Sequence, residues 1–164
     1  MSERTLYLTA LAVHLVSVAV WFGGNIFFIG FVALSRREPF LREIRARLIY
    51  IYALAYRKMT YYLFAFAFLS GLTLVHVNGL LNRSLFTSPA GKMALAKLVL
   101  FTAMFALQLV HDFIIGPRSY EVVGDRVRVK DEYRAANRLI GWTVFLLTCS
   151  LFTVGLLLSR GVYL

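Results

Sequence analysis

The stretch LYLTALAVHLVSVAVWFGGNIFFIGFVAL, residues 6–34, contains no Asp, Glu, Lys or Arg. A helix needs ~20 predominantly apolar residues to cross a bilayer, so this run predicts a membrane-spanning helix. Three more apolar runs follow it, at about residues 59–81, 92–115 and 138–158. The sequence therefore predicts an all-α integral membrane protein with four transmembrane helices.

The composition agrees with a membrane protein of one domain. The chain has 164 residues, of which 60% are hydrophobic, and its mean hydropathy is +0.72. Soluble domains contain roughly 45–50% apolar residues. Residues 1–164 are expected to form a single transmembrane domain, because four spans leave no room for a second core. Cys149 is the only cysteine, which excludes an intrachain disulfide.

The net charge of +10 is concentrated in two clusters that separate the apolar runs. One cluster lies between runs one and two and the other between runs three and four; the members are Arg36, Arg37, Arg42, Arg45, Arg47, Arg57, Lys58 and then Arg118, Arg126, Arg128, Lys130, Arg134, Arg138. Basic loops remain on the cytoplasmic side of a membrane. This predicts an up-down-up-down antiparallel bundle in the plasma membrane with both termini outside. We expect anionic lipid headgroups, and not nucleic acid, to bind these loops.

The segments between the spans have their own patterns. Residues 40–56 mix Arg with Leu, Ile and Tyr, which predicts an amphipathic helix with a tyrosine belt at headgroup level. Residues 82–91 are expected to form a short polar turn. Gly116 and Pro117 predict the end of the third span, followed by a charged loop to Asn137.

All three histidines lie inside apolar runs, where ionisable groups are costly and usually functional. His14 and His76 fall roughly 10 Å and roughly 8 Å from the outer ends of their spans, at matched depth. Two imidazoles at one depth on neighbouring helices are a suitable pair of axial ligands for haem b. The alternative is that each forms a separate interhelical hydrogen bond.

Lys97 falls at a similar depth, where it either neutralises a haem propionate or acidic substrate, or extends to the outer headgroups. Two heptad-like stripes predict which helix faces line the interior: His14, Val18, Trp21, Asn25, Phe28 and Lys97, Phe101, Met104, Gln108, His111. His111 falls near the cytoplasmic end, where it is a second candidate metal ligand, part of a proton relay with Asp112, or an interfacial residue. Adjacent helical positions point to different faces, so Asp112 is not expected to orient His111.

Copper is the alternative metal. Met59, Met93 and Met104 together with imidazole suit Cu(I), although methionine also fills gaps between apolar helices. The glycines at positions 23, 24 and 71 predict close packing of helices or of a flat cofactor.

Two segments resemble a known family. Residues 11–24 carry a His at 14, a Trp seven positions later at 21, and then Gly23 and Gly24; this pattern resembles the first helix of the copper-resistance protein D (CopD) family. HemJ-type protoporphyrinogen oxidases have a similar His and Trp, and residues 91–100 are similar to the lysine-bearing third helix of both groups. The resemblance implies a bundle related to b-type haem proteins, with His14, Trp21, Gly24 and Lys97 at the site.

The sequence therefore predicts a multi-pass membrane protein that holds haem b near its outer face, with His14 and His76 as iron ligands beside Trp21, Gly24 and Lys97. Its expected work is electron transport or oxidation of a small redox substrate, a quinol or a porphyrinogen, with a redox partner and a second copy of the chain as protein partners. The alternatives are a copper-transporting or copper-handling protein and a cofactor-free assembly subunit. No nucleophile–base pair, phosphate loop or carboxylate dyad indicates hydrolysis.

Overall fold

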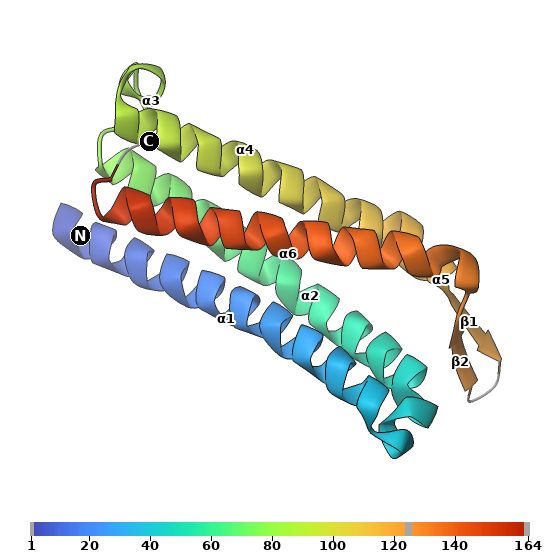
Figure 1. Ribbon diagram of the computed structural model, residues 1–164. Helices are drawn as coiled ribbons and strands as arrows, with labels where there is room; N and C mark the ends of the chain where they lie inside the picture. Colours follow the sequence, from blue (N-terminus) through green and yellow to red (C-terminus); the bar gives the residue numbers. More distant parts are fainter. Residues whose placement is uncertain (1, 124–125, 163–164) are drawn as a thin grey trace.

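Long helices make up most of the protein, whose computed structural model describes residues 2–123 and 126–162. Figure 1 shows these helices running the length of the molecule: α1 (Glu3–Arg37), α2 (Pro39–Val77), α4 (Pro89–Val110) and α6 (Asp131–Ser159). The short elements are α3 (Ser84–Thr87), the π-helix η1 (His111–Ile115), α5 (Gly116–Ser119), β1 (Tyr120–Val123) and β2 (Arg126–Val129). The predicted all-α class is confirmed, and four helical segments are long and apolar enough to cross a membrane.

The α1–α2 connection is shorter than the sequence suggests. The Ser2 side chain caps α1 by accepting a hydrogen bond from the Thr5 N–H, and only Glu38, in extended conformation, separates α1 from α2. Pro39 then starts α2, where its missing N–H has no cost. The predicted amphipathic segment and second span are one continuous helix, because no Gly or Pro interrupts residues 40–70.

The connection between α4 and α6 is more ordered than the predicted charged loop. At Gly116 and Pro117 the chain remains helical by widening into η1 before α5, since proline supplies no N–H to continue the α-helical pattern. β1 and β2 then form an antiparallel hairpin. α6 begins at Asp131, not at residue 138, and acidic residues in its first turn stabilise that helix end. The side chains of Arg42 and Arg126, two of the loop arginines, lie outside the described part.

The four long helices form two pairs, α1 with α2 and α4 with α6. Large side chains fill the space between the pairs; this core contains Trp21, Phe64, Met104, Ile140, Val144 and Leu151. Trp21 and Phe64 meet edge to face with ring centroids 5.2 Å apart, and Phe22 of α1 stacks on Phe152 of α6 at 5.4 Å. Many other large apolar side chains are exposed on the outside of the helices, which agrees with contact to lipid.

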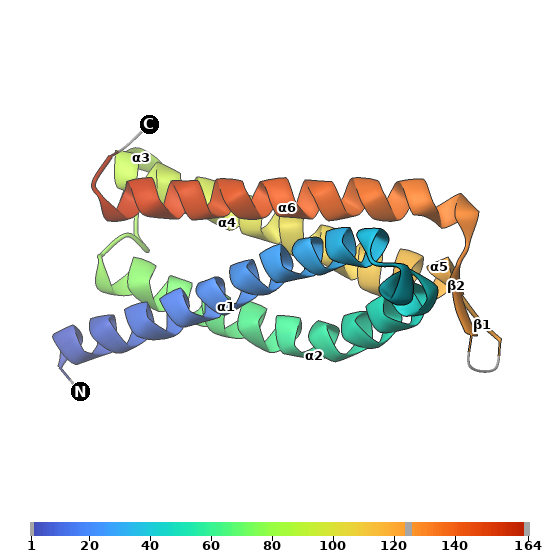
Figure 2. The ribbon, with the colours of Figure 1, turned by 60° about the horizontal axis from the view of Figure 1, so that its bottom comes forward.

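The two ends of the molecule differ. Figure 2 shows both termini and α3 at one end, called here the terminal end, and the α1–α2 connection and β-hairpin at the other, called the hairpin end. In Figure 1 α1 and α6 diverge toward the hairpin end. Two clusters of hydrogen-bonded ionisable side chains lie inside the molecule, one nearer to each end.

Candidate functional site

The first polar cluster, called the terminal-end cluster, consists of His14, Ser70 and Lys97. The His14 Nδ1 atom lies 2.9 Å from the Ala67 carbonyl oxygen and 3.2 Å from the Ser70 hydroxyl. Its Nε2 atom lies 3.4 Å from the Lys97 Nζ atom. A backbone carbonyl accepts only, so Nδ1 carries the proton and Nε2 is left to accept from Lys97. The structure thus brings together two residues that the sequence assigned to one site.

Glycines make the room for this cluster. A Cβ atom at Gly71 of α2 would lie 3.3 Å from the His14 ring, and one at Gly155 of α6 would lie 2.9 Å from the Lys97 Nζ atom. All four long helices therefore contribute to the cluster. Among the described residues no carboxylate pairs with Lys97, so the ammonium group relies on His14 alone.

His76 is not part of the terminal-end cluster. Gly71 faces His14, and five further residues turn the helix direction by about 140° at 3.6 residues per turn. The His76 side chain is accordingly exposed on the outside of α2. The structure does not place His14 and His76 on two sides of a shared space, because matched depth does not give matched facing.

The second polar cluster, called the hairpin-end cluster, surrounds the carboxylate of Asp112. This residue is 7% exposed. Its Oδ1 atom accepts from Gln108 Nε2 at 2.9 Å and from His111 Nδ1 at 3.0 Å, and its Oδ2 atom accepts from the Tyr61 hydroxyl at 2.9 Å. Three donors satisfy a buried carboxylate and hold it in one position.

The side chains of His111 and Asp112 contact each other, so the prediction that these neighbours point to different faces was wrong. Both lie in the π-helical turn η1, where the backbone is wider than an α-helix and adjacent side chains can converge. Because Asp112 accepts from Nδ1, the Nε2 atom of His111 is the basic one. That atom forms no hydrogen bond with the described part of the chain. An imidazole oriented by a carboxylate in this way is a common metal ligand.

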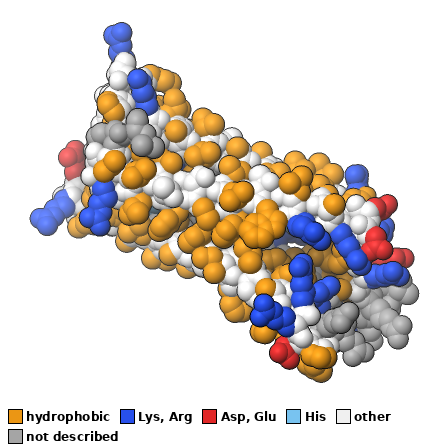
Figure 3. Space-filling model, viewed as in Figure 1, with side chains coloured by type: hydrophobic (Ala, Val, Ile, Leu, Met, Phe, Trp, Pro, Cys, Tyr) orange, Lys and Arg blue, Asp and Glu red, His pale blue; other side chains and the backbone are white. Residues whose placement is uncertain are grey.

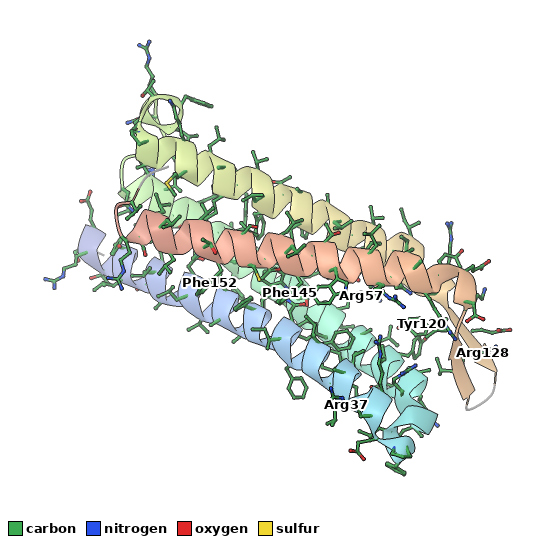
Figure 4. The ribbon with its side chains drawn as sticks, viewed as in Figure 1. Arg37, Arg57, Tyr120, Arg128, Phe145 and Phe152 are labelled. Atoms are coloured by element: carbon green, nitrogen blue, oxygen red, sulfur yellow. The ribbon has the colours of Figure 1, made fainter. Side chains whose placement is uncertain are left out.

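A crevice opens beside His111, between α1–α2 and α6. Its volume is about 670 Å³, and residues of α1, α2, α4, η1, β1, β2 and α6 line it. Figure 3 shows basic side chains gathered around a hollow toward the hairpin end, and Figure 4 shows Arg57, Tyr120 and Arg128 in the gap between α6 and the α1–α2 pair. Burial raises the pKa of the Tyr120 phenol, so this side chain remains neutral beside the arginines.

Aromatic rings form one wall of the crevice. Tyr52 stacks on Phe28 with centroids 5.0 Å apart and on Tyr56 with centroids 5.2 Å apart. The Tyr56 hydroxyl donates to the Trp21 carbonyl oxygen at 3.0 Å. The sequence assigned these tyrosines to an interfacial belt; the structure turns Tyr52 and Tyr56 inward. Trp21 also lines the crevice, whereas the sequence placed it in one site with His14 and Lys97, which do not line it.

Gly24 permits this packing, and its replacement supplies a test. A Cβ atom at position 24 would overlap the Tyr56 ring, whereas one at Gly23 would meet nothing within 4 Å. We expect Gly24→Ala to lower the free energy of unfolding by about 1–3 kcal/mol through overpacking. Gly23→Ala should be neutral or slightly stabilising, since alanine favours helix. Unfolding in detergent measures both; equal effects would show that Tyr56 does not need this space.

The known proteins supply no family assignment. No family model, no curated protein and no solved structure matches this chain. Within residues 2–123 and 126–162, no three His, Cys, Asp or Glu side chains gather closely enough to hold a metal ion. A metal held by His111 would therefore need further ligands from elsewhere, as haem iron receives from its macrocycle.

Proposed function

We propose that this protein is a multi-pass membrane redox protein that binds haem b in the crevice at its hairpin end. The observation that carries the proposal is the position of His111: its Nδ1 atom is held by buried Asp112, at the wall of a crevice of about 670 Å³. Ligand sites of this size are mostly apolar with a few placed polar groups. This crevice combines both.

The residues present fit a haem group. The rings of Phe28, Tyr52 and Tyr56 stack on one another and line the crevice, where their edges offer apolar and edge-to-face contact to a flat macrocycle. The Nε2 atom of His111 is basic and available as an axial ligand, and arginines at the rim suit carboxylates. Bound haem would supply one-electron redox chemistry, used for electron transfer or for oxidation of a small substrate such as a quinol or porphyrinogen.

The terminal-end cluster fits haem less well. His14 uses both ring nitrogens, toward Ala67 and Lys97, and His76 is on the far side of α2. The crevice, in contrast, needs no rearrangement of a hydrogen-bonded imidazole. We therefore assign the iron to His111, and we assign to His14 and Lys97 contact with the small substrate.

We further propose that the hairpin end faces the cytoplasm. It holds both arginine-rich connections, and basic connections resist translocation across the membrane. The plasma membrane with its anionic inner leaflet then surrounds the crevice. In this orientation the protein binds haem, a redox partner on the cytoplasmic side, and lipid headgroups.

Absorption spectroscopy of the purified protein tests the haem proposal. We expect a Soret band and sharp bands that change on reduction, and His111→Ala should shift or abolish them because it removes the axial imidazole. Asp112→Asn should change the reduction potential of bound haem, since the carboxylate that accepts from the Nδ1 atom of His111 increases the basicity of the iron-binding imidazole.

Two matched variants complete the test. His14→Ala and His76→Ala should leave the haem spectrum in place, because neither residue lines the crevice. Loss of haem in these two variants, with His111→Ala unaffected, would restore the ligand pair predicted from the sequence. Stoichiometric copper without haem would favour copper handling, and absence of both would favour a cofactor-free subunit.

A further inference from the structure

The crevice has far more positive than negative charge. Six arginines line it against one aspartate; they are Arg36, Arg45, Arg57, Arg128, Arg134 and Arg138. Asp112 is already occupied by its three side-chain donors. A cleft lined by one sign of charge attracts ligands of the opposite sign.

Four of these arginines lack a partner within the described chain. Arg134 pairs with Asp131 at 2.8 Å, and Arg57 donates to the Asp112 carbonyl oxygen at 3.3 Å. No hydrogen bond or ion pair to the described residues engages the guanidinium groups of the others, Arg36, Arg45, Arg128 and Arg138. Guanidinium groups form their strongest contacts with carboxylates and phosphates, to which they donate two hydrogen bonds at once.

The unpartnered arginines come from opposite sides of the crevice. Arg36 and Arg45 belong to the α1–α2 pair, whereas Arg128 and Arg138 belong to β2 and α6. Tyr61 and Arg57 of α2 make polar contacts across the two helix pairs at this end, and both of these contacts go to Asp112. A ligand with two anionic groups would therefore connect arginines of the α1–α2 pair with arginines of β2 and α6 across the crevice.

We propose that the crevice ligand is an amphipathic dianion whose two oxyanion groups are held at the rim by arginines of both helix pairs. This inference rests on the proposed function for the identity of the ring system, and it adds the charge and the orientation of the ligand. The apolar body of the ligand lies against the aromatic wall, and its two anionic groups face the cytoplasm. The rigid stack of Phe28, Tyr52 and Tyr56 offers edge-to-face contact at the crevice, which favours a flat dicarboxylate over the flexible chains of a phospholipid.

Metal-free protoporphyrin IX and its dimethyl ester are the probes, since they differ only in the two charges. Trp142→Phe leaves Trp21, at the crevice wall, as the only tryptophan, so quenching of its fluorescence reports binding. We expect the diacid to bind roughly tenfold to a hundredfold more tightly than the ester, the value of charged hydrogen bonds. The diacid should also raise the melting temperature more than the ester, because it connects the two helix pairs.

A matched pair of double variants locates the charge contacts. Arg36→Gln with Arg138→Gln should weaken binding of the diacid roughly tenfold or more and leave binding of the ester unchanged. Arg37→Gln with Arg118→Gln removes the same charge outside the crevice lining and should change neither. Equal binding of diacid and ester, or equal effects of the two double variants, would overturn the proposal.

Two further arms separate the sources of the signal. Nanodiscs of phosphatidylcholine, with and without phosphatidylglycerol, test whether lipid is the occupant. If phosphatidylglycerol competes with the diacid, and if this competition is lost in the variant with Arg36→Gln and Arg138→Gln, the rim binds lipid. That result would overturn the proposal of a dicarboxylate. His111→Ala should not alter binding of the metal-free diacid. Failure of the haem assignment would therefore appear in the His111→Ala absorption spectrum, and failure of the dianion inference would appear here.

Discussion

Replacing Asp112 by alanine should lower the free energy of unfolding by about 3–5 kcal/mol. The substitution removes the shared acceptor of Tyr61, Gln108 and His111 and leaves three donors without a partner inside a membrane-spanning segment. It also removes the hydrogen bond from Tyr61 that connects α2 to η1, and it leaves the contact of Arg57 with the backbone carbonyl of residue 112. Reversible unfolding in mixed detergent micelles measures the change.

Two variants show whether the carboxylate itself is responsible. Asp112→Asn retains one acceptor oxygen and the side-chain shape, so we expect a loss of only about 1–2 kcal/mol. Asp131→Ala removes an acid that is exposed and paired with Arg134, and such pairs contribute about 1 kcal/mol or less. A loss for Asp112→Ala as small as that for Asp131→Ala would mean that the three donors find other partners.

Replacing Lys97 by methionine should have opposite effects on stability and on function. The ammonium group lies among four helices with His14 as its neutral partner, and the described residues offer it no acid. A charge in such a place is costly, so Lys97→Met should raise the free energy of unfolding by about 1–3 kcal/mol. If Lys97 contacts the small substrate, reduction of bound haem by a quinol should slow at least about tenfold, the effect of losing one charged hydrogen bond.

Lys92 provides the matched control for Lys97, because it lies on the same helix with an exposed side chain. Lys92→Met should change neither stability nor reduction rate appreciably. A stabilised Lys97→Met protein with an unchanged rate would limit this lysine to a structural role. A destabilised one would show that Lys97 has an anionic partner in the membrane, such as a lipid or the substrate itself.

The sequence alone was enough to predict the helices. The long apolar runs predicted four helices of membrane-spanning length, and the structure contains four helical segments that are long and apolar enough. The two stripes that predicted the interior faces also agree with the structure, since Trp21 and Met104 are buried and Gln108 lines the crevice. The contact between His14 and Lys97 follows from the same argument, because both lie at one depth on inward faces. Helix boundaries were less accurate, since Arg-rich ends continue a helix as readily as they end it.

Only the tertiary structure decided how the polar residues combine. His76 has the right depth but faces outward, because five residues beyond Gly71 rotate it by about 140°. His111 and Asp112 meet in a π-helical turn, which Pro117 favours. The sequence prediction that their side chains point to different faces assumed the regular spacing of an α-helix. The crevice is lined by residues of α1, α2, α4, η1, β1, β2 and α6, and no local pattern records the distance between elements that are far apart in sequence. Apolar periodicity determines which face of each helix is buried, and packing determines which buried faces meet.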